Sequence, residues 1–186
     1  MNKSLLTLML IALLTIGCTT ETKTDPFKIG KQHIGLLTDS TQVKDLHLAF
    51  PTDSIVKNIM GDEFLGDIND IEIYDTVTRK QLLTLTPTQS LDSTATIKSI
   101  HIIDSRFKTE KNISALSTFA DIKNNYKISG ISTLINSIVI SVNEINASFT
   151  IDKKELPANL QFNMDLKIEA VQIPDHAKIK YFMLYW

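Results

Sequence analysis

"TQVKDLHLAF" (Thr41–Phe50) and "STFADIKNNY" (Ser117–Tyr126) are the two stretches that decide the fold class. In the first, Val43, Leu46 and Phe50 recur at the spacing that places apolar side chains on one face of a helix. The second stretch repeats that spacing, and a hydroxyl residue precedes each pattern as an N-cap. The sequence therefore predicts two short helices, at about residues 42–49 and 117–126.

The two helical stretches match one another when they are aligned without gaps. The apolar pairs in this alignment are Val43 with Phe119, Leu46 with Ile122, and Phe50 with Tyr126. An internal duplication would produce such a match, but so would any two short amphipathic helices that begin with an N-cap. The sequence leaves both explanations open.

Strand-like segments surround the two helical stretches. They are short, rich in β-branched residues, and most alternate apolar and polar side chains, which is typical of half-buried strands. They are residues 31–37, 54–60, 71–75, 81–87, 96–104, 127–134, 136–145, 147–153, 167–174 and 177–186. We predict an α+β fold, a mostly antiparallel sheet of about nine strands with two short helices. A duplicated strand–helix–hairpin unit would account for this order.

The first eighteen residues read "MNKSLLTLMLIALLTIGC" and contain the only cysteine of the 186-residue chain, Cys18. Lys3 followed by the apolar run Leu5–Leu14 is typical of a secretory signal, and the run is too short to span a bilayer. Gly17 before the cysteine is typical of a bacterial lipobox, although Thr15 stands where leucine is usual. The alternative is a plain signal peptide with a leftover thiol. We predict that Cys18 is lipidated, because attached acyl chains give stable membrane anchoring.

The predicted domain organisation follows from this leader. Residues 1–17 form the signal peptide, residues 18–27 the lipidated cysteine and a flexible polar tether, and residues 28–186 one globular α+β domain. The chain carries 19 basic and 21 acidic side chains, with a formal net charge of −2 and no basic block. This charge pattern argues against a nucleic-acid partner.

Motifs that carry catalytic or metal chemistry are not apparent. His33, His47, His101 and His176 have no partner at metal-ligand spacing. "GDEFLGDIND" (Gly61–Asp70) holds four acidic side chains, but their spacing does not match a calcium loop, and we read it as a solvated loop. The chain has no G-x-S-x-G motif, and its cysteine is assigned to lipid. We therefore expect no catalytic residues, no metal and no cofactor.

A short motif, Asp followed by Ser or Thr and then a small or branched residue, occurs four times. It resembles the O-glycosylation acceptor of exported Bacteroidetes proteins. Its candidate acceptors are Ser40, Ser54, Thr76 and Ser93. Turns and caps made by Asp and Ser are the alternative explanation.

Several segments together resemble the RpoE-regulated lipoprotein family of envelope proteins. They are the lipobox signal, "IGLLTDST" before the first helix, "IKSIHIIDSRF" in mid-chain, "ISALSTFADI" after it, and closure on an apolar strand that ends in Trp186. The resemblance covers about residues 30–130 and the last ten residues. In "ISALSTFADI", Leu116 stands before the hydroxyl residue, where family members tend to have glycine. The resemblance implies an envelope location and an α+β fold, and it implies no reaction.

The sequence thus predicts a non-enzymatic envelope lipoprotein of binding or structural type. Its expected partners are the membrane, through the lipid, and a protein of the envelope. The expected location is the bacterial envelope, at the outer membrane. Two other functions remain open: a hydrolase-like envelope enzyme whose site is assembled from scattered residues, and an inhibitor-like or assembly-accessory module.

Overall fold

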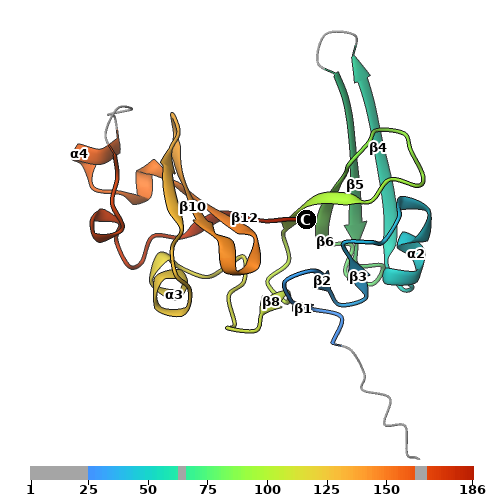
Figure 1. The fold of residues 1–186 in the computed structure, drawn as a ribbon, viewed down its shortest axis with the longest axis horizontal. Helices are drawn as coiled ribbons and strands as arrows, with labels where there is room; N and C mark the ends of the chain where they lie inside the picture. The colour runs from blue at the N-terminus through green and yellow to red at the C-terminus, as the bar shows by residue number, and fades with distance from the viewer. Residues whose placement is uncertain (1–24, 63–65, 162–166) are drawn as a thin grey trace, which may run out of the picture.

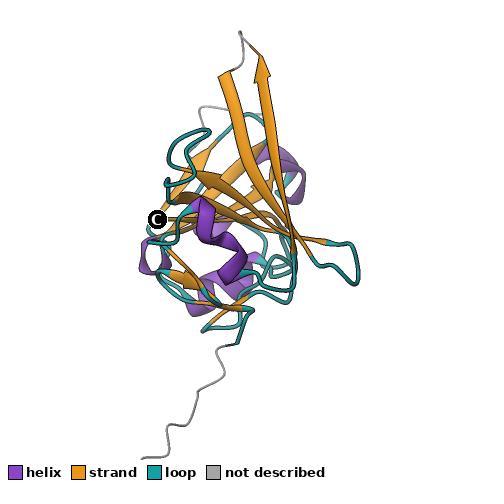
Figure 2. Ribbon diagram, turned by 90° about the vertical axis from the view of Figure 1, so that its right-hand side faces the viewer, coloured by secondary structure: helices purple, strands orange, loops and turns teal. Residues whose placement is uncertain are grey.

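A computed structural model describes residues 25–62, 66–161 and 167–186. An eight-stranded antiparallel sheet forms its framework (Figure 1), with the strand order β4-β5-β6-β7-β12-β11-β10-β9. The strands are β4 (Ser54–Asp62), β5 (Gly66–Tyr74), β6 (Gln81–Pro87), β7 (Ile97–Ile102), β9 (Gly130–Thr133), β10 (Ser137–Val142), β11 (Ala147–Asp152) and β12 (Ile179–Tyr185). The hairpin of β4 and β5 extends well beyond the other strands (Figure 2).

A second, smaller sheet lies beside the first half of the large one. Its order is β3-β2-β1-β8, and only the pair of β1 with β8 is parallel. Each strand has two residues: β1 (Lys28–Ile29), β2 (His33–Ile34), β3 (Leu37–Thr38) and β8 (Lys108–Thr109). β8 thus ties the first residues after the predicted tether to the middle of the chain.

Short helices cover the two halves of the sheet. In the first half, the 3-10 turn η1 (Val43–Asp45) continues into α2 (Leu46–Ala49), and in the second half α3 (Phe119–Asn125) takes the matching place. The remaining helical turns are η2 (Asn143–Ile145), η3 (Lys153–Glu155), α4 (Ala158–Gln161) and η4 (Ala170–Gln172). The two predicted helices are therefore confirmed, but the hydroxyl N-cap predicted for the first is wrong, because Gln42 precedes η1.

The two halves of the fold repeat one another. Each begins with a helix and continues as a four-stranded meander, and the two meanders meet at β7 and β12. The backbone N–H of Val43 donates to Ala95 O at 2.9 Å, and Phe119 N–H donates to Ala177 O at the same distance. The residue before each helix also forms a β-bridge to the residue before the last strand of its own half, as Gln42–Thr96 and Thr118–Lys178.

The register at the centre of the sheet agrees with a pseudo-two-fold axis. Ile102 pairs with Phe182 and Ile100 pairs with Leu184, and these two pairs exchange under the repeat. The pair of His101 and Met183 lies between them, and the repeat places each of these two residues at the position of the other. The repeat that two ten-residue segments left open in the sequence thus extends over the whole sheet. It is a helix with a four-stranded meander rather than a helix with one hairpin.

The core lies between the sheets and the helices. The helical residues that the spacing predicted as apolar faces are buried: Val43, Leu46, Phe50, Phe119, Ile122 and Tyr126. Alternate residues of the central strands join them, such as Phe149 and Phe182, whose ring centroids are 4.6 Å apart. β12 buries only one face, since Tyr181 and Tyr185 are 43% and 46% exposed. The predicted closing strand is therefore confirmed, and it packs on the core with one face.

The structure corrects three local predictions. The predicted acidic loop at residues 61–70 is mostly the far end of the β4–β5 hairpin, of which residues 63–65 lie outside the described chain. Residues 167–174 contain the turn η4 and no strand. Ile168 and Ile173 are buried on either side of that turn and do not belong to one alternating pattern. The stretch predicted as one strand at residues 31–37 is two, β2 and β3, joined by a turn in which Gly35 has a φ of 54°.

Candidate functional site

A cavity of about 440 Å³ lies in the first half of the fold, where the small sheet meets the end of α2 and the β5–β6 turn. We call it the Arg106 cavity. Its base includes the buried side chains of Phe50, Leu82 and Phe107. Asp53, Asp75 and Arg106 also line it, so that it combines an apolar base with charged groups. Such a combination is typical of ligand sites.

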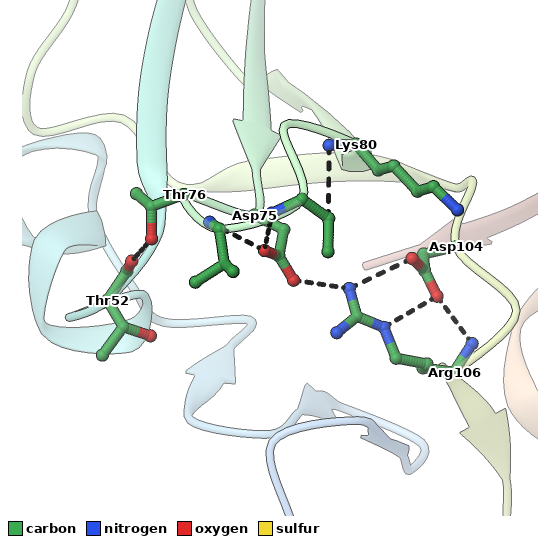
Figure 3. Close-up of polar contacts among 8 residues, drawn as sticks. Thr52, Asp75, Thr76, Lys80, Asp104 and Arg106 are labelled. Atoms are coloured by element: carbon green, nitrogen blue, oxygen red, sulfur yellow. Dashed lines mark hydrogen bonds and ion pairs between the residues drawn. The ribbon is translucent and has the colours of Figure 1, made fainter.

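Arg106 is held between two carboxylates (Figure 3). Its Nη2 donates to Asp75 Oδ2 at 2.9 Å, and its Nε and Nη2 donate to the two oxygens of Asp104 at 3.1 Å each. The guanidinium also stacks over the Phe27 ring at 4.6 Å from the centroid. Two-point contact with a carboxylate fixes the orientation of an arginine, so this side chain is preorganised although 41% of it is exposed.

The β5–β6 turn holds Asp75 in place. Its Oδ1 accepts the backbone N–H groups of Val77 at 3.0 Å and Thr78 at 2.8 Å, as in an Asx turn. The hydrogen bond from Thr78, together with the bond from Arg106, lowers the pKa of Asp75 from 3.8 to about 2. Burial acts to raise the pKa of Asp104, but its hydrogen bonds from Arg106 outweigh burial and lower it. Both carboxylates are therefore ionised at neutral pH.

Asp53 differs from the two carboxylates that hold Arg106. Among the described residues, its carboxylate has no hydrogen-bond partner. Burial and the neighbouring charge of Asp75 raise the pKa of Asp53, and the charge of Arg106 only partly opposes this. Nη1 of Arg106 likewise makes no hydrogen bond within the described chain. Among the charged groups that line the cavity, the Asp53 carboxylate and Nη1 of Arg106 are thus without a hydrogen bond in the described part of the chain.

The hydroxyl groups at the cavity are not arranged as nucleophiles. Thr76 Oγ1 donates to the backbone oxygen of Thr52 at 2.7 Å (Figure 3), and no histidine is among the described residues that line the cavity. A nucleophilic hydroxyl needs a neighbouring base to accept its proton. The carboxylates that hold Arg106 are poor bases, because their pKa values lie below the ordinary value. Neither of these two carboxylates is thus placed to activate the Thr76 hydroxyl, which already donates to Thr52 O.

The structure locates four of the five predicted modification sites. Cys18 lies outside the described residues. Ser40, Ser54, Thr76 and Ser93 are all exposed, in turns or at the start of β4. Asp75 and Asp92 cap their own turns, as Asp92 Oδ1 accepts the N–H of Thr94 at 2.7 Å, in accord with the turn explanation. O-glycosylation of the four hydroxyls stays a prediction.

The four histidines considered from sequence lie on different elements or connections. His33 lies on β2, His47 on α2, His101 on β7, and His176 just before β12. Among the described residues, no three His, Cys, Asp or Glu side chains form a group that could hold a metal ion.

Sequence reasoning did not single out Arg106 or the cavity. Two of the four Asp-Ser/Thr motifs could have pointed to the cavity. Asp53 precedes β4 and Asp75 follows β5, and these two strand ends are paired, with Ser54 opposite Tyr74. Two acidic residues at one end of a hairpin are brought together by the pairing itself. Their arginine could not be found in this way, because it follows β7.

No protein-family model and no curated protein matches this chain. The structure is similar to the crystal structure of the uncharacterised protein yfeY from Escherichia coli, with a TM-score of 0.56 and 13% sequence identity. The similarity covers 86% of this chain and 99% of that one. At this identity it shows a shared fold with a bacterial protein. None of the helices in the described part of the chain has the length and apolar character that crossing a membrane requires.

Proposed function

We propose that this protein is a lipid-anchored protein of the bacterial envelope that binds a ligand in the Arg106 cavity and catalyses no reaction. The observation that carries the proposal is the cavity itself. It has an apolar base, a fixed arginine and one carboxylate without a partner. Preformed sites with a few placed polar groups are the usual form of small-ligand sites.

The position of the tether supports this assignment. Pro26 and Phe27 line the cavity, and only eight peptide steps separate Cys18 from Pro26. A fully extended chain of that length spans at most ~29 Å, by the usual limit of about 3.6 Å per residue. A lipid on Cys18 would therefore keep the cavity within reach of the membrane surface.

The resemblance of the sequence to envelope lipoproteins supports the location. The same resemblance implies no reaction, in agreement with a cavity in which the carboxylates that hold Arg106 are fixed by hydrogen bonds.

One experiment with two arms tests the proposal in the native bacterium. In the first arm, cells are fed an alkyne-bearing palmitate, and the protein is purified and examined for the label. We expect label on the natural chain and none on Cys18→Ser. Equal labelling of both chains, or of neither, would remove the anchor from the proposal.

The second arm places a photo-crosslinking amino acid at Val77, which lines the cavity and is 89% exposed. The matched control is the same amino acid at Val171, which is 87% exposed on η4 and does not line the cavity. We expect a discrete adduct from position 77 after irradiation of intact cells, and none from position 171. Identical adduct patterns at both positions would show that the cavity is not a binding site.

A further inference from the structure

We propose that the Arg106 cavity selects a small amphiphile that carries one protonated amine, with the amine against Asp53 and the apolar chain over Phe50, Leu82 and Phe107. This inference rests on the proposed function, since it assigns a ligand class to the same cavity.

The charged side chains around the cavity favour a ligand with a positive charge. Arg106 is shared by two carboxylates, those of Asp75 and Asp104, at hydrogen-bond distance. Arg106 therefore bonds two of the three carboxylates, whereas Asp53 has no cation at hydrogen-bond distance among the described residues. One positive charge on the ligand would complete the set.

The position of Asp53 favours a ligand that has an apolar part as well as a charge. Asp53 lies in the turn after α2, three residues beyond Phe50, and its carboxylate and the Phe50 ring line the same cavity. A ligand that contacts the carboxylate can therefore cover the apolar base at the same time. A bare cation would leave that base uncovered, and a purely apolar molecule would leave the carboxylate unpaired and partly desolvated.

The volume of the cavity limits the size of the ligand. About 440 Å³ is near the lower end of the range of roughly 300 to 1,000 Å³ for small-molecule sites. The base is closed by three side chains that are at most 7% exposed, which limits the ligand to a short chain. This size favours a single small amphiphile over a folded partner element.

The acid–base behaviour of Asp53 agrees with this assignment. Burial and Asp75 make its ionised form costly in the empty cavity, which is why its pKa is raised, while Arg106 acts in the opposite direction. An ammonium group at Asp53 would relieve that cost. Binding of the amine should therefore weaken as the pH falls and Asp53 takes up a proton.

The test compares three probes with the same six-carbon chain: n-hexylammonium, 1-hexanol and hexanoate. The lipidated chain is placed in phosphatidylcholine nanodiscs, and binding is measured by titration calorimetry at pH 7, with empty nanodiscs subtracted. We expect n-hexylammonium to bind at least ~10-fold more tightly than 1-hexanol, and hexanoate to bind most weakly. That preference should disappear in Asp53→Asn and persist in Asp39→Asn, a matched control in the same Asp-Ser context outside the cavity.

Each outcome decides between the two proposals. Equal binding of the three probes would overturn the amine inference and leave the cavity as a binding site. A preference for n-hexylammonium that survives in Asp53→Asn would also overturn the inference. Failure of all three probes to bind would overturn the amine inference, and the crosslinking comparison of positions 77 and 171 then tests the proposed function by itself. Thermal unfolding of both variants shows that they are folded before the titrations are compared.

Discussion

At the scale of single residues, the cavity contains two aspartates whose surroundings shift their pKa values in opposite directions. Asp75 receives two backbone N–H groups and the Arg106 guanidinium, whereas Asp53 receives none of these. Hydrogen bonds to an ionised carboxylate stabilise it, and burial without such bonds destabilises it. The first aspartate therefore supports the folded state, and the second lowers its stability in return for a group that a ligand can use.

The opposite shifts predict opposite mutational effects. The folded pKa of Asp75, about 2, lies below its ordinary value of 3.8, so its stabilisation is complete above about pH 4 and is lost toward pH 2. Asp75→Asn should lower the free energy of unfolding at pH 7 and flatten its fall over that acid range. Urea titrations from pH 2 to 7 measure both effects.

Asp53→Asn is the matched comparison in the same urea titrations. The raised pKa of Asp53 means that its ionised form costs stability at neutral pH, and that this cost disappears as the pH falls through the folded pKa. The variant should therefore be at least as stable as the natural chain at pH 7. A loss of stability as large as that of Asp75→Asn would show that Asp53 has a structural partner.

Sequence reasoning could reach only part of this residue-scale picture. Asp53 and Asp75 could be noticed in the sequence because a hydroxyl residue follows each of them, and a turn depends on adjacent residues. The contact of Arg106 with Asp75 joins residues 31 positions apart, and only the order of the strands creates it. Nothing in the tripeptide around Arg106 distinguishes it from a solvated surface arginine.

At the scale of elements, periodicity predicted well where an element has a buried stripe of several residues. The two helices have such stripes, and both were predicted. β8 has two residues, of which only Thr109 is buried, so it has no periodic pattern and is absent from the strands predicted from sequence. A two-residue strand is fixed by its partner β1 rather than by its own pattern.

The helical stripes give a prediction for stability. Leu46 and Ile122 are 1% and 0% exposed and occupy equivalent places in the two halves. Truncation of either residue to Ala should lower the free energy of unfolding by about 2–5 kcal/mol, the usual cost of such a cavity in a core. Leu48→Ala is the control, since Leu48 is 64% exposed on the same helix, and its cost should be small. Losses near zero at both buried positions would show that the helices are not packed as described.

At the scale of the whole molecule, the decisive contact is the pairing of β7 with β12. It joins two meanders that are far apart in the chain into one sheet, around the self-equivalent pair of His101 and Met183. The repeat could be suspected from ten residues of each half, because a helix is a local structure. The way in which the halves join could not, because two such units can pair along either edge strand and leave the sequence pattern unchanged.

That joint predicts that the two halves unfold together. Phe182 on β12 is fully buried, packs on Phe149, and pairs with Ile102 of the other half. Phe182→Ala should cost about 3–5 kcal/mol of stability, the usual range for a core phenylalanine. Because the sheet is continuous, the loss should increase amide hydrogen exchange in β5 and β6 as much as in β10 and β11. Ile100→Ala, the equivalent change in the first half, should speed exchange in the same strands. If either variant increased exchange only in its own half, the halves would be independent folding units and the β7–β12 pair merely a contact between them.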